Sequence, residues 1–237
     1  MSTTFPDSLV PANDAARLRT LHQYHIVNTT PEPIFDDYTA WAAQLFNTPI
    51  SLISLVDDDY VWFKSVTGAE GIPGLPRVES MCSAAILQDE AVVTSDYKAE
   101  SCTLIKPDVA QAIGLKFYAG AALQMPGGFR VGMLAVIGRE FRTISEKETA
   151  VLARLAALVS QTIELRARYL NAHQQEEWEE AQAELADTLD ENSALARYLS
   201  SRNNGIDFDD DDVAPLIERR LDGLGKVLKR RMTQATG

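Results

Sequence analysis

The chain has 237 residues, 46% of them hydrophobic, which is enough for one substantial core with an appendage. A formal net charge of −12 disfavours nucleic acid as a partner. No apolar run reaches the ~20 residues that a membrane helix needs, and the start, MSTTFPDS, lacks the pattern of a signal peptide. We therefore expect a cytoplasmic protein that binds neither nucleic acid nor a membrane.

Two helices and a hairpin are predicted in the first third of the chain. Helical spacing of apolar residues begins near Asn13 and again over about residues 34–47. Pro49 ends the second helix, and residues 50–56 are apolar at almost every position, which is typical of a strand covered on both faces. An acidic turn then returns the chain through residues 60–66 as the partner strand.

The middle of the chain is less regular. Residues 67–77 hold three glycines and two prolines, which predicts irregular structure. A short helix at 79–87 and a short strand at 91–94 are expected to follow. Residues 116–125 and 129–137 predict a second hairpin around a glycine-rich turn. Strands that pair as local hairpins, with helices near the ends of the sequence, indicate an α+β domain with a mainly antiparallel sheet.

The chain beyond Ser145 is predicted to be helical. Ser145 and Glu148 have the spacing of a capping box, which starts a long helix with one apolar stripe. A second helix is expected over the acidic segment 171–202. A heptad seam in it is formed by Trp178, Leu185, Asn192 and Leu199. This seam predicts a two-stranded coiled coil, although a helix packed within the same chain fits the pattern equally well.

Charge is unevenly distributed in this tail. Residues 174–192 contain eight acidic and no basic residues, and an Asp-rich linker is expected over 203–212. Residues 213–237 contain six basic and two acidic residues in an amphipathic helical pattern. The basic helix could fold back on the acidic one or dock on a different protein.

Several motifs, in order, resemble those of bacterial GAF sensor domains, and they place such a domain over residues 13–170. The matching stretches are Arg17-Leu18, FDDYTAWAAQLF at 35–46, PISLISLVD at 49–57, WFKS at 62–65, PRVESMC at 76–82 and FYAGA at 117–121. The resemblance implies a GAF-like (PAS-related) six-stranded sheet flanked by helices, with a C-terminal helical tail. It also implies binding of a small ligand or a partner helix rather than catalysis, with no metal and with the cofactor unknown.

The resemblance places a pocket between one face of the sheet and the crossover segments 67–87 and 96–114. The candidate ligand-binding residues are Trp62, Lys64, Arg77, Ser80, Cys82, Asp96, Tyr118 and Met133. Lys64 and Arg77 could hold an anionic group, and the two aromatic side chains could stack on a ring.

Each candidate also has a structural interpretation. Trp62 fits a core position, and Lys64 fits the solvated side of a strand. Arg77 could pair with Asp96 or Glu79 instead of holding a ligand.

Cys82 and Cys102 are the only cysteines, which excludes a disulfide framework or a cysteine-based zinc site. In relatives of this fold, cysteines reduce free methionine-(R)-sulfoxide or hold a bilin. The cysteine arrangement of the reductase is not found in this sequence. Ser83 replaces the histidine that the bilin-binding relatives need. Two reduced, partly buried thiols are the simpler interpretation.

We therefore expect a stand-alone sensor or adaptor that binds an unidentified small molecule. It would be homodimeric through its terminal helices and would contact a signalling partner through residues 174–237. The alternatives are a thiol enzyme similar to free methionine-(R)-sulfoxide reductase and a structural interaction protein without a ligand.

Overall fold

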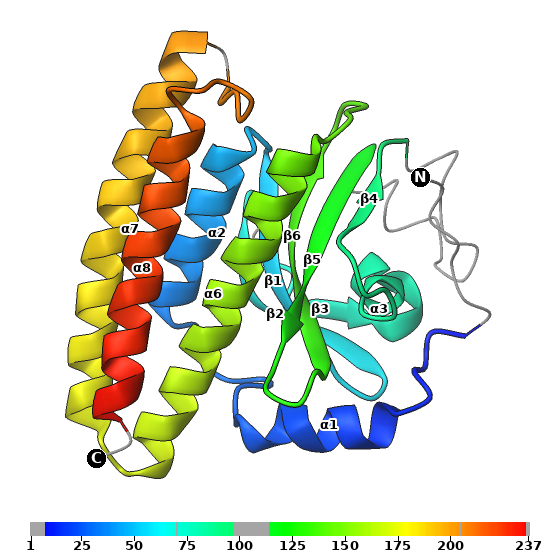
Figure 1. Cartoon of the computed structure of the whole chain (residues 1–237). Coiled ribbons are helices and arrows are strands. Elements are labelled where there is room, and N and C mark those ends of the chain that lie inside the picture. Colours follow the sequence, from blue (N-terminus) through cyan, green and yellow to red (C-terminus); the bar gives the residue numbers. More distant parts are fainter. Residues whose placement is uncertain (1–7, 70, 97–113, 204, 236–237) are drawn as a thin grey trace.

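The computed structural model of the protein describes residues 8–69, 71–96, 114–203 and 205–235. In this part of the chain, a six-stranded sheet separates two layers (Figure 1). The strands are β1 (Ile50–Val56), β2 (Tyr60–Thr67), β3 (Gly74–Pro76), β4 (Val92–Thr94), β5 (Phe117–Gln124) and β6 (Arg130–Gly138). They follow the order β3-β2-β1-β6-β5-β4, and every neighbouring pair is antiparallel.

Helices cover both faces and one end of this sheet (Figure 1). They are α1 (Asp14–Gln23), α2 (Pro33–Leu45), α3 (Met81–Ala85), α6 (Glu146–Asn171), α7 (Gln175–Asn203) and α8 (Ala214–Gln234). Helices α2 and α6 lie directly on one face, with α7 packed on α2 and α8 on α6, while α3 lies on the opposite face. This confirms the predicted α+β architecture with a helical tail. None of the helices described above is long and apolar enough to span a bilayer.

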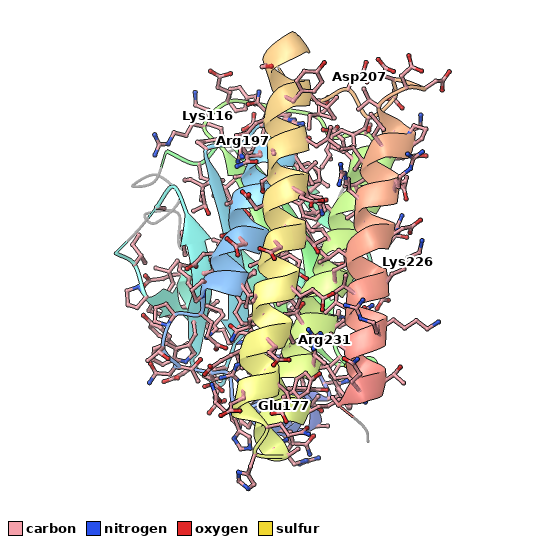
Figure 2. All side chains as sticks on the ribbon, turned by 90° about the vertical axis from the view of Figure 1, so that its left-hand side faces the viewer. Lys116, Glu177, Arg197, Asp207, Lys226 and Arg231 are labelled. Carbon is pink, nitrogen blue, oxygen red and sulfur yellow. The ribbon has the colours of Figure 1, made fainter. Side chains whose placement is uncertain are left out.

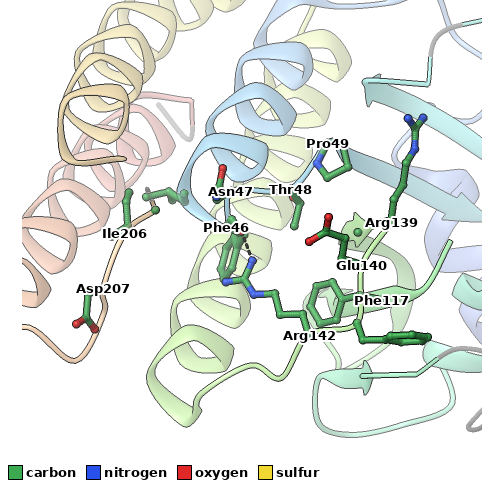
Figure 3. A pocket seen from close by; sticks show the side chains of 14 residues that line it. Phe46, Asn47, Thr48, Pro49, Phe117, Arg139, Glu140, Arg142, Ile206 and Asp207 are labelled. Atoms are coloured by element: carbon green, nitrogen blue, oxygen red, sulfur yellow. Dashed lines mark hydrogen bonds between the residues drawn. The ribbon is translucent and has the colours of Figure 1, made fainter. Parts of the chain in front are cut away.

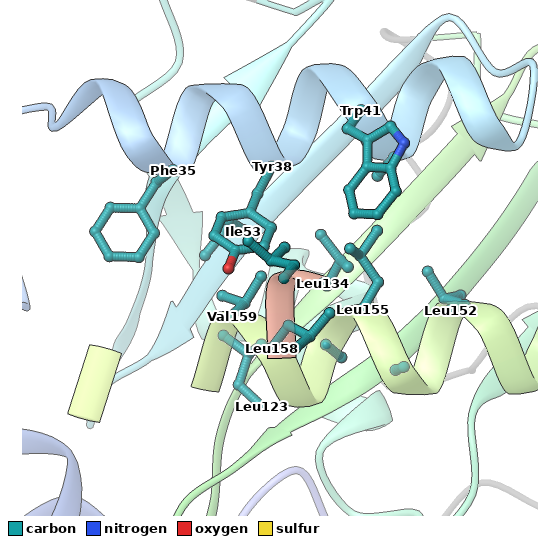
Figure 4. Close-up of a cluster of buried hydrophobic side chains, with 14 of the residues drawn as sticks. Phe35, Tyr38, Trp41, Ile53, Leu123, Leu134, Leu152, Leu155, Leu158 and Val159 are labelled. Atoms are coloured by element: carbon teal, nitrogen blue, oxygen red, sulfur yellow. The ribbon is translucent and has the colours of Figure 1, made fainter. Parts of the chain in front are cut away.

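Strand β1 joins two hydrophobic cores because all seven of its residues are buried. Ile53 and Leu55 belong to a large core shared with α2 and α6, part of which is shown in Figure 4. Ile50 and Leu52 belong to a smaller core beneath α3. Side chains alternate between the two faces of a strand, so one layer of backbone connects the two cores.

Strand β3 lies in the segment 67–77, for which the sequence predicted irregular structure. Residues Gly74–Pro76 instead pair with β2 at the edge of the sheet. The prediction was wrong because a short edge strand tolerates proline, which cannot donate a hydrogen bond to a neighbouring strand. Glycine is also required here, since a Cβ on Gly74 would lie 2.2 Å from the carbonyl oxygen of Val61.

The tail is a helical hairpin packed along the body. The predicted capping box starts α6, where Glu148 N donates to Ser145 Oγ at 3.1 Å and Ser145 N donates to Glu148 Oε2 at 2.8 Å. The chain turns at His173, whose φ is +57°. The residues of the predicted seam are buried within this chain, namely Trp178, Leu185, Asn192 and Leu199. The intramolecular alternative therefore describes α7, and the homodimer stays a prediction.

The basic helix α8 folds back on the acidic helix α7. Arg231 Nε donates to Glu184 Oε2 at 2.7 Å, and Arg220 lies 3.4 Å from Glu191. Figure 2 shows the two helices side by side, with Glu177 and Arg231 toward the same end. Opposite charges on facing helices therefore accompany the apolar contacts of the tail.

Candidate functional site

A small cavity lies between the sheet and the segment that crosses it after β2. Its volume is about 70 Å³. The covering segment includes a 3-10 turn at Arg77–Glu79 followed by α3, so the helix predicted over 79–87 is shorter than expected. The residues that line the cavity are Ile50, Leu52, Phe63, Val66, Ala69, Ile72, Leu75, Glu79, Ser80, Met81, Cys82, Leu115, Tyr118 and Ile137.

Most polar atoms of the cavity lining are grouped around Cys82. Its sulfur lies 3.7 Å from Tyr118 Oη, and Ser80 Oγ accepts a hydrogen bond from Cys82 N at 3.3 Å. Burial raises the pKa of the Cys82 thiol, although hydrogen bonds from Ser54, Tyr118 and Ser80 act in the opposite direction. A Cβ on Gly120 would lie 2.5 Å from Tyr118 Oη, so glycine leaves room for the tyrosine ring.

Arg77 fixes the covering segment to the N-terminal helix. Its guanidinium donates to Asp14 Oδ2 at 2.9 Å and to the carbonyl oxygens of Leu9 and Asp58 at 2.9 and 3.0 Å. Arg17 Nε donates to Asp14 Oδ1 at 2.6 Å. Burial alone would raise the pKa of Asp14, but the two guanidinium groups hold it below its ordinary value. The predicted pairing of Arg77 with Asp96 or Glu79 is wrong, because its carboxylate partner is on α1.

Lys64 lies on the opposite face of the sheet from the cavity. Its ammonium group donates to Glu32 Oε1 at 2.7 Å, Thr29 Oγ1 at 2.8 Å and the Thr30 carbonyl at 2.8 Å. Arg166 Nε on α6 donates to Glu32 Oε2 at 2.8 Å. Burial lowers the pKa of Lys64, against the attraction of Glu32. The expected solvated lysine is therefore a buried link between β2 and α6.

A β-bulge lies at Lys64 in β2. Ile53 is paired with Ser65, but the next residue of β1, Ser54, is paired with Phe63, so Lys64 is an extra residue in β2. Ser65 also hydrogen-bonds to α2, and two successive side chains of β2 thus face the helices. A bulge of this kind redirects a side chain, here that of Ser65, which regular alternation after Phe63 and Lys64 would place on the cavity face.

A larger, open groove lies where the tail meets the end of the body (Figure 3). Its volume is about 800 Å³, and it is bounded by the α2–β1, β6–α6 and α7–α8 connections. Arg142 donates to the Phe46 carbonyl and to Glu148, and its guanidinium lies 5.7 Å from the centre of the Phe117 ring. The ring of Phe208 stacks on Phe46 at 5.7 Å. These contacts fasten the tail connection to the body.

The family model of the GAF domain matches residues 30–163. The chain belongs to the GAF family. This match covers more than half of the sequence and includes β1 to β6 and most of α2 and α6. The family resemblance that the sequence motifs predicted is thereby confirmed.

A cyclic di-GMP phosphodiesterase of Pseudomonas aeruginosa is 32% identical to this GAF protein over 150 residues. The match covers 63% of this chain and 25% of the relative, so the chain spans about a quarter of that protein.

Two solved structures are similar at low identity. The blue-light absorbing form of the PixJ GAF domain from Thermosynechococcus elongatus has 18% identity and a TM-score of 0.49, covering 67% of this chain and 92% of that one. The free methionine-R-sulfoxide reductase of Neisseria meningitidis, in complex with its substrate, has 17% identity and a TM-score of 0.49. The match covers 72% of this chain and 99% of the reductase.

The cavity of this GAF domain brings together three of the eight candidate residues, Ser80, Cys82 and Tyr118. Met133 is fully buried in the same core but does not line the cavity. Asp96 is half-buried just after β4 and does not line it either. Cys102, the possible second thiol, falls outside the described residues, as does most of the crossover 96–114.

The other three candidates lie away from the cavity. Trp62 packs against the helix-side core, with its ring 4.7 Å from that of Tyr60, which agrees with its structural interpretation. Lys64 and Arg77 are held by the contacts given above. Sequence reasoning missed the apolar lining, although the alternation in residues 50–56 could have indicated which side chains of β1 share a face. Ligand binding by any lining residue stays a prediction.

Proposed function

We propose that this GAF domain is a regulatory module in which a small molecule in the cavity changes the position of α6 and the tail. The observation that supports this best is that the strands lining the cavity also pack on α2 and α6 with their opposite face. A ligand that displaces β1 or β2 would therefore also move the helices that pack on the opposite face of these strands.

A polar connection follows the same route. Phe63 lines the cavity, and the next residue, Lys64, contacts Glu32, which is held by Arg166 of α6. Arg166 also donates to the His25 carbonyl at 3.1 Å. These groups join β2, the α1–α2 connection and α6, so a shift of the bulge would move all three together.

Helix α6 in turn contacts the tail along its length. Arg154 pairs with Glu218 and with Asp222 Oδ1, the second at 2.6 Å. Tyr169 Oη donates to the Arg231 carbonyl at 3.4 Å. We propose that α7 and α8 present the change to a signalling partner or a second copy of the chain in the cytoplasm. The name of the Pseudomonas relative makes enzymes of cyclic di-GMP turnover the first partners to test.

A structural interaction protein without a ligand is the second candidate. The cavity volume of about 70 Å³ favours it, since typical ligand pockets measure roughly 300–1,000 Å³. The thiol enzyme gains less support, because Cys82 is 3% exposed and its pKa is raised, which disfavours the reactive thiolate.

The test compares two substitutions of valine by phenylalanine. Val66→Phe fills the cavity, whereas Val78→Phe alters a side chain that is 45% exposed. Native mass spectrometry of the chain purified from its own host should show a retained small mass in the wild type and in Val78→Phe, but not in Val66→Phe.

Hydrogen exchange provides the second readout. We expect exchange in α6 to α8 to differ between Val66→Phe and wild type, and not between Val78→Phe and wild type. Unchanged exchange together with no retained mass would support the structural candidate instead. Reduction of free methionine sulfoxide that disappears in Cys82→Ser would support the thiol enzyme.

A further inference from the structure

The chemistry of the cavity narrows the class of ligand, an inference that rests on the proposed function. We infer that the ligand is a small, uncharged, mainly apolar molecule with one hydrogen-bonding group, and not an anion such as a nucleotide. Four observations lead to this class: the lining, its polar end, the location of the nearby cations and the available volume.

The lining is apolar except at one place. Ten of the fourteen described lining residues are aliphatic residues, phenylalanine or methionine, contributed by β1, β2, β6, the covering segment and Leu115 before β5. An ionised group placed among them would lose its hydration without a compensating partner, which strongly disfavours binding. An apolar molecule loses nothing comparable and gains from leaving water.

The polar end suits one neutral group. Ser80, Cys82 and Tyr118 bring a hydroxyl, a thiol and a phenol to the same part of the cavity, within the hydrogen-bond contacts already described. Each of these groups can donate and accept while uncharged. A hydroxyl or thiol on a ligand would find both kinds of partner there.

Among the residues that the structure describes, the two cations suggested for an anion are engaged elsewhere. Arg77 is directed to Asp14 and to backbone carbonyls near α1, and Lys64 is bound to Glu32 on the far face of the sheet. Among the described lining residues the only charged one is the acidic Glu79. The sequence-based expectation that Lys64 and Arg77 hold an anionic group is therefore wrong for this cavity.

The volume sets the size of the ligand. The cavity measures about 70 Å³, the space of about two water molecules at roughly 30 Å³ each in the liquid. Ethanol, with three heavy atoms, is of suitable size, whereas a nucleotide would have to displace the covering side chains. Two of the lining residues, Val66 and Ala69, are only partly buried.

The test uses two probes with one carbon skeleton, ethanol and acetate, with cyclic GMP as a third. Each is titrated into the full chain at neutral pH, and amide shifts of Leu52, Cys82 and Tyr118 are followed by NMR. We expect saturable shifts with the alcohol and at least tenfold weaker binding of the carboxylate and the nucleotide. Val66→Phe should weaken alcohol binding at least tenfold, and Val78→Phe should leave it unchanged.

The outcomes separate this inference from the proposed function. Equal or tighter binding of the carboxylate or of cyclic GMP at these residues would overturn the ligand class and leave the regulatory proposal intact. Binding of the alcohol without any change of hydrogen exchange in α6 to α8 would support the class and count against regulation. Failure of all three probes to bind would overturn the inference.

Discussion

Glu32 holds two buried cations from opposite sides, so its neutralisation should be costly. Its carboxylate accepts from Lys64 Nζ at 2.7 Å and from Arg166 Nε at 2.8 and 2.9 Å. The Lys64 and Arg166 side chains are only 2% and 8% exposed. Glu32→Gln keeps the shape and one acceptor oxygen but removes the charge, which leaves both cations without a counter-ion.

The structure allows an estimate of the effect. Removing one partner of a buried ion pair costs about 3–5 kcal/mol. Lys64 keeps its contacts with Thr29 and Thr30, and Arg166 keeps the carbonyls of the α1–α2 connection, so we expect the low end, about 3 kcal/mol. At about 2–4 °C per kcal/mol for a chain of this size, the Tm should fall by about 6–12 °C.

Urea unfolding and hydrogen exchange check this estimate. The matched control is Glu218→Gln, which neutralises a half-exposed partner of Arg154 and should change stability by about 0.2–1 kcal/mol. Glu32→Gln should also increase exchange in the second half of α6, near Arg166. A loss equal to that of Glu218→Gln, with α6 exchange unchanged, would refute the view that Glu32 couples β2 to α6.

Four further substitutions test other contacts by urea unfolding. Gly120→Ala should lower the free energy of unfolding by about 1–3 kcal/mol because its Cβ overlaps Tyr118. Gly223→Ala in α8, where a Cβ meets nothing within 4 Å, should raise it by about 0.5–1 kcal/mol. Equal effects of the two substitutions would contradict this. The pKa of Asp14 lies below 3.8, so Asp14 contributes stability that is present above pH 3.8 and lost as the pH falls through its folded pKa. Asp14→Asn should therefore be less stable at neutral pH but lose less on acidification, and an unaltered acid profile would count against the argument. Asn192→Leu should gain about 1 kcal/mol or more, because both amide atoms of Asn192 are buried without a hydrogen-bond partner in the described structure; a loss would indicate that the amide is satisfied in solution.

Much of the fold could be predicted because it depends on local patterns. Residues 50–56 form a strand covered on both faces, and Ser145 caps α6, as their sequences indicate. The burial of Lys64 could not be predicted, since its carboxylate partner, Glu32, is 32 positions away. The partner of Arg77 is 63 positions away, and local sequence does not show which distant carboxylate meets it.

The packing partner of α7 in the tail could not be predicted from the sequence either. A seven-residue repeat in α7 correctly predicts a buried helical seam, and Trp178 is 2% exposed as that requires. The repeat does not specify whether the covering helix belongs to the same chain or to a second one. Here α2, most of whose residues are buried, is that helix.

The return of α8 along the body has a practical consequence for measuring the tail. Arg231 lies beside Tyr169, so the last turn of α8 is close to the corner between α6 and α7. A fluorophore pair at His173 and Gln234 would consequently report, by energy transfer within one molecule, whether α8 is packed on the body or detached from it. Such labelled protein could be screened against metabolite mixtures without knowing beforehand which compound acts.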